Sequence, residues 1–241
     1  MRIGALVVLV SAVIACSGCG GLFRQYEYEE DVYLSLDGSA TVYVNSSIAA
    51  LNDLRGATFD ARPNARVDLE AVRAYFTTPV TRVIRVSSTR RSNRHFVHVR
   101  LEVDDVRRMS EAGPFAWSSY RFEKDGELLS YRQTIGAPAP RAQPARWDGD
   151  ELTAFRLHAP SRIVDHNSPT GEERGSILAW EQPLEARLAG TPVTIDARME
   201  PQSILARTLL LFGATMLAVA LLFVVVIWWI VRPGRRPEAG G

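Results

Sequence analysis

Residues 26–44 read YEYEEDVYLSLDGSATVYV and set the pattern for the folded part of the chain. From Tyr26 to Leu36 apolar residues alternate with acidic or polar ones, and a period of two predicts a half-buried strand. Asp37-Gly38 is a hairpin signal, because glycine readily adopts a positive φ. Residues 40–44 return with the same alternation. The stretch therefore predicts an antiparallel hairpin.

The chain from residue 45 to 205 continues in short elements. One helix is expected over 48–54, with Ser46 or Ser47 as its cap and Gly56 as its end, and a second over 68–76. Strands are expected over 80–86, 95–103, 128–135, 153–159, 177–181 and 193–199. Between them we expect a polar turn over 87–93, a short helix capped by Asp104 or Asp105, and a hairpin turn at Asp125-Gly126. A loop is expected over 136–146.

These elements indicate an α+β fold, in which an antiparallel sheet carries short helices on one face. The Pro- and Ala-rich loop over 136–146 is the place where two domains would divide. Neither side of it has enough apolar segments for a core of its own. We therefore expect one exported domain over residues 20–205.

Residues 1–15 have the features of a secretory signal peptide, namely one positive charge at Arg2 and then an uncharged run of 13 residues. That run is too short to span a bilayer. Val13-Ile14-Ala15-Cys16 resembles the lipobox of bacterial lipoproteins, which implies that Cys16 carries a lipid. Cys19 is the alternative, because cleavage before it leaves no unpaired thiol in an oxidising compartment.

Residues 209–231 form an uncharged stretch of 23 residues, long enough for a helix to cross a bilayer with some tilt. Trp228 and Trp229 lie at its end, where amphipathic rings favour the membrane interface. The arginines that follow, in the tail over 232–241, put the C-terminus in the cytoplasm by the positive-inside rule. These residues are Arg232, Arg235 and Arg236. The sequence thus predicts a single-pass protein of the bacterial cytoplasmic membrane, with its main domain on the extracytoplasmic side.

Composition excludes several classes of protein. The 241 residues have a formal net charge of +1, too balanced for a nucleic-acid binder that works by bulk electrostatics. Two cysteines, both near the N-terminus, exclude a disulfide scaffold and a Cys-rich zinc site. We therefore expect no nucleic-acid partner and no metal.

A search for catalytic motifs finds none. His95 and His98 have opposite parity on one predicted strand and should not share a metal. We expect no enzyme, no catalytic residue and no cofactor. The alternative is an envelope hydrolase or transferase with a site of scattered residues near His158, Asp165 and His166.

The densest basic stretch lies between residues 80 and 108, with eight arginines against three acidic residues. Arg90, Arg91 and Arg94 fall together at a predicted hairpin tip. Guanidinium forks suit phosphate, so we expect these three to contact anionic headgroups. The alternative is a solvated polar turn in a chain whose only lysine is Lys124.

The layout resembles that of LppM-type bacterial envelope proteins. The likeness consists of the signal with a lipobox, the strand-Asp-Gly-strand opening over 32–44, the α+β body, the late strand with a tryptophan over 177–181, and one membrane helix before arginines. The resemblance implies a membrane-anchored (lipo)protein domain without catalysis. We expect it to bind a lipid-like ligand, such as a lipid or glycolipid, or a membrane-protein partner. A role as accessory subunit of a membrane complex is the remaining alternative.

Overall fold

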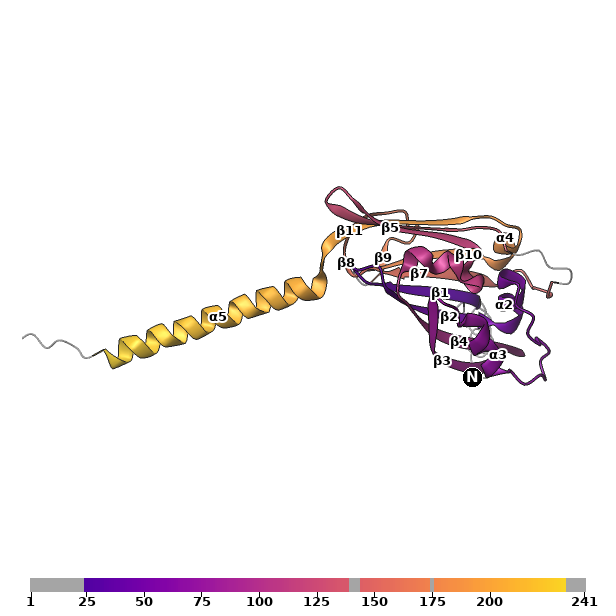
Figure 1. Ribbon diagram of the computed structural model, residues 1–241, viewed down its shortest axis with the longest axis horizontal. Helices are drawn as coiled ribbons and strands as arrows, with labels where there is room; N and C mark the ends of the chain where they lie inside the picture. Colours follow the sequence, from indigo (N-terminus) through magenta and orange to yellow (C-terminus); the bar gives the residue numbers. More distant parts are fainter. Residues whose placement is uncertain (1–23, 139–143, 174–175, 233–241) are drawn as a thin grey trace, which may run out of the picture.

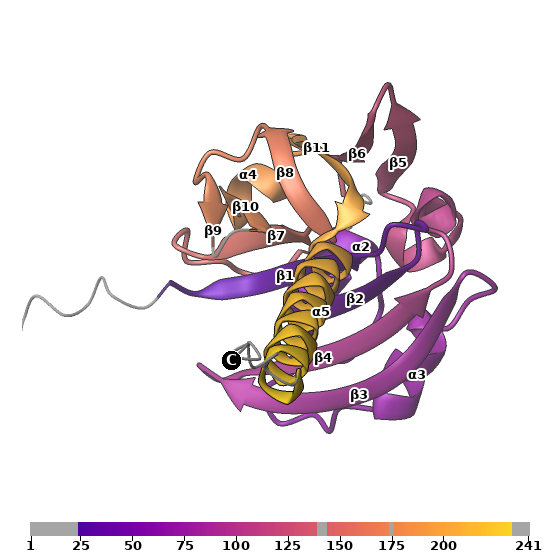
Figure 2. The same ribbon diagram turned by 90° about the vertical axis from the view of Figure 1, so that its left-hand side faces the viewer.

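A computed structural model describes residues 24–138, 144–173 and 176–232, and it shows two sheets, a few short helices and one long helix (Figure 1). The larger sheet has seven strands in the order β3-β4-β2-β1-β7-β10-β9, and the smaller has four in the order β5-β6-β11-β8. Viewed nearly along α5, the smaller sheet lies above strands β1, β2, β4 and β3 of the larger one (Figure 2).

The elements have the following bounds: β1 Tyr26–Leu34, β2 Ala40–Ser47, α2 Ile48–Arg55, α3 Leu69–Phe76, β3 Thr81–Arg91, β4 Arg94–Val103, β5 Ser118–Asp125, β6 Leu128–Ile135, β7 Leu152–His158, β8 Ser161–His166, β9 Glu172–Glu173, β10 Ile177–Pro183, α4 Leu184–Leu188, β11 Val193–Ser203 and α5 Ile204–Val231, with 3₁₀ turns at Val106–Glu111 and Gly113–Phe115.

The opening hairpin forms as the sequence predicts. β1 and β2 pair antiparallel with Val32 opposite Val42. Ser35 N donates to Ser39 O at 2.8 Å and closes the turn. Gly38 has a φ of +90°, a backbone conformation that favours glycine.

Both predicted helices are present, with the expected caps. Ser47 Oγ accepts a hydrogen bond from Ala50 N at 3.1 Å at the start of α2, which ends at Gly56 with a φ of 68°. Asp68 caps α3 by accepting from the amides of Glu70 and Ala71, each at 3.0 Å. The α+β class with short helices is confirmed.

Three strand assignments differ from the sequence prediction. β1 and β7 pair in parallel, so the larger sheet is mixed. The polar turn expected over 87–93 is mostly strand, because β3 continues to Arg91 and the chain reverses through Ser92 and Asn93, both at positive φ. β8 was not predicted, although Ser161 and Ile163 are buried while their neighbours are exposed, which is a period-two signal.

One hydrophobic core lies between the larger sheet and the elements packed on it. Residues from both sides of the loop over 136–146 contribute, such as Leu51 and Phe76 before it and Phe155 and Ile195 after it. On the strands of the larger sheet the buried residues alternate with ones on the opposite face, which remains accessible to solvent.

α5 follows β11 without an intervening loop and projects away from the domain (Figure 1). Within the described ranges, Thr208–Val231 is the one helix long and apolar enough to cross a bilayer, and none of it is buried against the domain. The predicted transmembrane helix is therefore present as an exposed apolar helix. The predicted signal peptide lies outside the described residues.

Replacing Ser47 by alanine tests the cap of α2. The Ser47→Ala variant should lower the free energy of unfolding by about 1 kcal/mol, because the Ala50 amide loses its buried partner. The measurement is chemical denaturation of the full chain in detergent. Ser119→Ala, at an exposed position on β5, is the control, and an equal effect of both changes would contradict the assignment.

Candidate functional site

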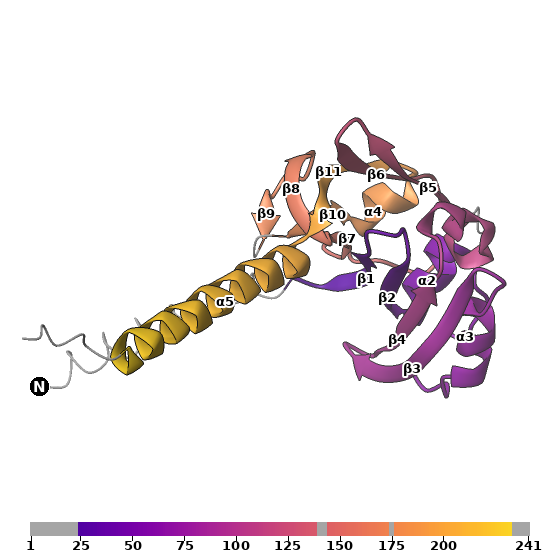
Figure 3. The ribbon, with the colours of Figure 1, turned by 60° about the vertical axis from the view of Figure 1, so that its left-hand side comes forward.

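The chain enters and leaves the domain at opposite ends. Gln25 O, just before β1, accepts from Leu152 N, and Glu151 O accepts from Leu184 N at the start of α4. From α4 the chain runs along β11, whose 11 residues span about 36 Å, and then directly into α5 (Figure 3). We call these the α4 end and the α5 end of the domain.

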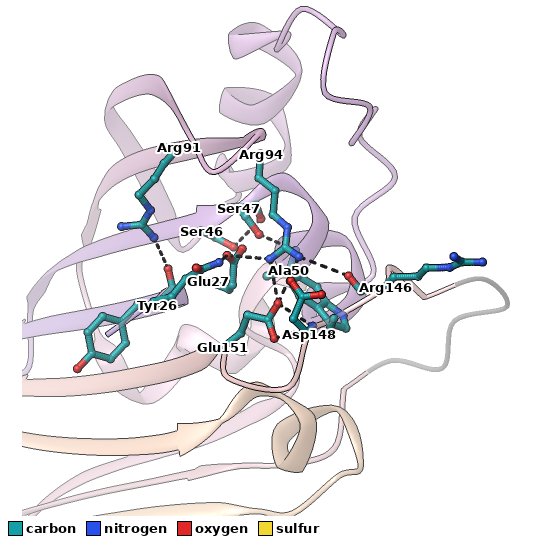
Figure 4. A network of polar contacts seen from close by, with 12 residues as sticks. Tyr26, Glu27, Ser46, Ser47, Ala50, Arg91, Arg94, Arg146, Asp148 and Glu151 are labelled. Atoms are coloured by element: carbon teal, nitrogen blue, oxygen red, sulfur yellow. Dashed lines mark hydrogen bonds and ion pairs between the residues drawn. The ribbon is translucent and has the colours of Figure 1, made fainter. Parts of the chain in front are cut away.

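Arg94 is half-buried at the α4 end and contacts two buried carboxylates (Figure 4). Its guanidinium lies 2.9 Å from Glu27 Oε1 and 3.2 Å from Glu151 Oε1, and it stacks over the Trp147 ring at 4.6 Å. Burial opposes its charge, but Glu27 and Glu151 raise the pKa of Arg94 above its usual value. Both carboxylates are buried. Arg94 therefore joins β1, β4 and the residues before β7.

The other two arginines of the predicted headgroup site are exposed at the same tip. Arg91 donates to Tyr26 O at 2.7 Å and covers the Phe96 ring, while Arg90 donates to Asn93 at 2.7 Å. The tip belongs to the α4 end, remote from the start of α5.

The structure separates the three residues of the alternative catalytic site. Asp165 and His166 lie on β8 in the smaller sheet, beside Arg198, which pairs with Asp165 at 3.3 Å. His158 lies on β7 in the larger sheet, with its Nε2 3.8 Å from Asp31. Among the described residues, no group of three or more His, Cys, Asp or Glu side chains is placed to hold a metal ion.

A buried ionic network joins the two sheets, and sequence reasoning missed it. Arg55 at the end of α2 pairs with Glu30 on β1, and both side chains are 1% exposed. Glu30 also accepts from Gln133 at 3.0 Å and from Tyr28 at 2.9 Å. The Arg55 guanidinium stacks on the Trp117 ring at 4.0 Å. The signal in the sequence was the parity of Glu30, which matches the apolar residues of β1.

The open face of the larger sheet carries a group of aromatic side chains in mutual contact. Tyr33 stacks on His158 with ring centroids 3.7 Å apart, and the Tyr43 ring lies 5.3 Å from Tyr33. His158 ends β7 at the α5 end, since the next strand begins at Ser161, which pairs with the last residue of β11. We call Tyr33, Tyr43 and His158 the aromatic cluster.

Beside the aromatic cluster the open face is charged. Arg156 on β7 neutralises two acids of β1, at 2.8 Å from Glu29 and 3.4 Å from Asp31. On the other side of Tyr43, a hollow of about 300 Å³ opens above β2, β3 and β4. The residues that line it are Tyr43, Asn45, Arg85, Ser87, His98, Val99 and Arg100. The open face thus places aromatic, acidic and basic side chains side by side.

The residues predicted for the membrane interface lie at the far end of α5. Trp228 and Trp229 are exposed on the helix, and Arg232 stacks over the Trp228 ring at 4.7 Å. This arrangement fits an interfacial position for the rings and the cation. Arg235 and Arg236 lie outside the described residues, as do Cys16 and Cys19, the two predicted lipidation sites.

The fold and its surface define an α+β domain carried on a single apolar helix with the length of a membrane span. No model of a known protein family matches the chain, and no curated protein matches it. Among solved structures it is similar to the NMR structure of the folded domain of LppM from Mycobacterium tuberculosis. The TM-score is 0.41 and the identity 12%, over 76% of this chain and 95% of that one. The resemblance is weak.

Neutralising Arg94 tests its internal role. Arg94→Gln should lower the free energy of unfolding by about 3 kcal/mol or more, because Glu27 and Glu151 are left as buried charges without their partner. Arg90→Gln, on the same tip but exposed, should stay within about 0.5 kcal/mol of the parent. Equal small changes in a denaturant titration would contradict the role of Arg94.

The buried Glu30 carboxyl gives stability a defined pH dependence. Burial raises its pKa from 4.5 to about 7, against hydrogen bonds from Gln133 and Tyr120. Between these values the unfolded chain binds fewer protons at this site than the folded one, so stability falls as pH rises. From pH 4.5 to 7 the parent should therefore lose stability relative to Glu30→Gln.

The measurement for Glu30 is the free energy of unfolding across that pH range for the parent, Glu30→Gln and Glu70→Gln. Glu70 lies exposed on α3 and serves as the control. A constant difference between the parent and Glu30→Gln at all pH values would show that Glu30 does not titrate in this range.

Proposed function

We propose that this protein is a non-enzymatic binding domain, anchored by α5 in the bacterial cytoplasmic membrane, whose open face takes up a lipid-like ligand or a protein partner beside the bilayer. The observation that carries the proposal is the position of the aromatic cluster. His158 and Tyr33 lie at the α5 end, close to the pairing of Ser161 with the last residue of β11.

The chemistry of the aromatic cluster supports a site at a membrane surface. Tyrosine and histidine present an apolar ring and a polar tip, and such side chains favour the zone where lipid meets water. Tyr33 is 43% exposed, although its ring stacks on His158. An exposed aromatic side chain on a sheet face that no apolar partner covers is available to a ligand.

A lipid at the N-terminus would add a second constraint. The chain enters at the α4 end, and from Cys19 or Cys16 to Arg24 there are five or eight residues, which reach at most about 17 or 28 Å. β11 alone spans about 36 Å between the two ends. Two anchors in one bilayer would therefore make the domain lie along the membrane surface.

A hydrolase or transferase is the less favoured function. It would need His158, Asp165 and His166 within reach of one substrate, yet they belong to different sheets. In addition, His166 Nδ1 accepts a hydrogen bond from Ser168 N at 3.1 Å and thus serves the local turn. Triads depend on side chains that converge in space.

A photo-crosslinking amino acid at position 33 tests the proposal. In nanodiscs, the full chain with Cys16→Ser and Cys19→Ser, carrying the probe in place of Tyr33, should form adducts with lipid, because the α5 end faces the bilayer. The same probe in place of Thr194, exposed on the smaller sheet at the α4 end, should form none. Mass spectrometry identifies the adducts, and equal labelling at both positions, or none at position 33, would overturn the proposal.

A further inference from the structure

We propose that the hollow formed around Arg85 and Arg100 binds a phosphate group of a ligand. This inference rests on the proposed function and names the chemistry of what the open face takes up. Three observations support it. Arg85 and Arg100 have no carboxylate partner among the described residues, both line the same hollow, and the aromatic cluster adjoins that hollow.

The two arginines lie directly opposite each other on neighbouring strands. The register of β3 and β4 shifts between Val83 and Arg85, which brings Arg85 into a cross-strand pair with Arg100. Like charges in such a pair repel and destabilise the sheet. A shared anion between the two guanidinium groups removes the repulsion, so the arrangement is favourable with a ligand and unfavourable without one.

Other arginines on the sheet faces show what ordinary neutralisation looks like in this protein. On the same face Arg82 pairs with Glu102, and Arg156 pairs with Glu29 and Asp31. On the smaller sheet Arg132, which lies opposite Arg121, pairs with Asp196. Within the described ranges neither Arg85 nor Arg100 has a carboxylate partner, so theirs is the cross-strand arginine pair left without a counter-charge.

The side chains around the pair complete a site for an oxyanion. Tyr43, Asn45 and Ser87 line the same hollow and bring hydroxyl and amide groups to it. The Asn45 Oδ1 atom lies 2.9 Å from His98 Nδ1, a contact that orients the amide. Two guanidinium forks with neutral donors match the oxygen-rich, doubly charged surface of phosphate.

The aromatic cluster adjoins this site and offers a place for the rest of the ligand. Arg100 lies over the Tyr43 ring at 5.7 Å, and Tyr43 contacts Tyr33, which stacks on His158. A phosphate at the two arginines would therefore continue into a group that packs on aromatic rings. The carboxylates on this side, Glu29 and Asp31, are paired with Arg156 and leave the arginine pair as the anion site.

The phosphate has two possible sources, a lipid headgroup and a free phosphate. Isothermal titration of the full chain in a non-ionic detergent distinguishes them, with inorganic phosphate, glycerol 3-phosphate and a short-chain phosphatidic acid as probes. Tighter binding of phosphatidic acid than of inorganic phosphate identifies a headgroup site. Binding of inorganic phosphate at least as tight identifies a site for the free anion.

Arg85→Gln/Arg100→Gln should weaken every probe that binds the parent by tenfold or more, since each charge-assisted hydrogen bond is lost. Arg66→Gln/Arg121→Gln removes the same charge from exposed arginines elsewhere and should leave affinity within twofold. Without phosphate, the first double variant should be at least as stable as the parent in a denaturant titration, because a repulsive pair is gone.

Absence of binding by all three probes, or equal affinity of the Arg85→Gln/Arg100→Gln variant and the parent, would overturn this inference. Equal weakening by both double variants would assign the effect to net charge and would overturn it as well. If any of these results were found together with lipid adducts at position 33, the proposed function would still hold and only this inference would be wrong. A lack of adducts there would remove the proposed function itself.

Discussion

The backbone of β11 runs unbroken from the smaller sheet into the apolar helix α5, and the account of the surface depends on this continuity. β11 is tied to β6 and β8 by cross-strand pairing, down to its last residue opposite Ser161. A strand fixed in this way sets where the helix begins. The ends of β1 and β7 therefore lie at the α5 end of the domain, with Tyr33 and His158, and the tip with Arg94 lies at the far end.

Arginine has three different roles in this chain, and only its surroundings tell them apart. Arg55 and Arg94 are held by buried carboxylates, and they join segments that are distant in the sequence. Arg82, Arg132 and Arg156 form ion pairs on the sheet faces. Arg85 and Arg100 have no such partner among the described residues, and they flank a hollow. The first role concerns stability, the second surface neutrality, and the third points to a ligand.

Local features of the fold were predictable from the sequence, and long-range ones were not. Asp37-Gly38, Ser47 and Asp68 act within a few residues, so their turn and caps follow from local chemistry. The parallel pairing of β1 with β7 joins segments more than 100 residues apart, and no hairpin signal marks it. β8 was missed because one buried alternation of six residues is short.

The arginine tip was expected from charge alone, but the partners of Arg94 come from β1 and from the turn before β7. For the candidate site, residue types indicated basic chemistry between 80 and 108, whereas the register shift that pairs Arg85 with Arg100 could not be read from sequence.

The most direct test of the central claim is the height of the two ends of the domain above a bilayer. A fluorescent amino acid is placed at Asp37 or at Thr191 in the full chain with Cys16→Ser and Cys19→Ser, so that no lipid is attached at either position. Energy transfer to labelled headgroups in nanodiscs is then measured. Strong transfer is expected from position 37, at the α5 end, and weak transfer from position 191, at the α4 end. Equal transfer from both positions, or stronger transfer from position 191, would contradict it.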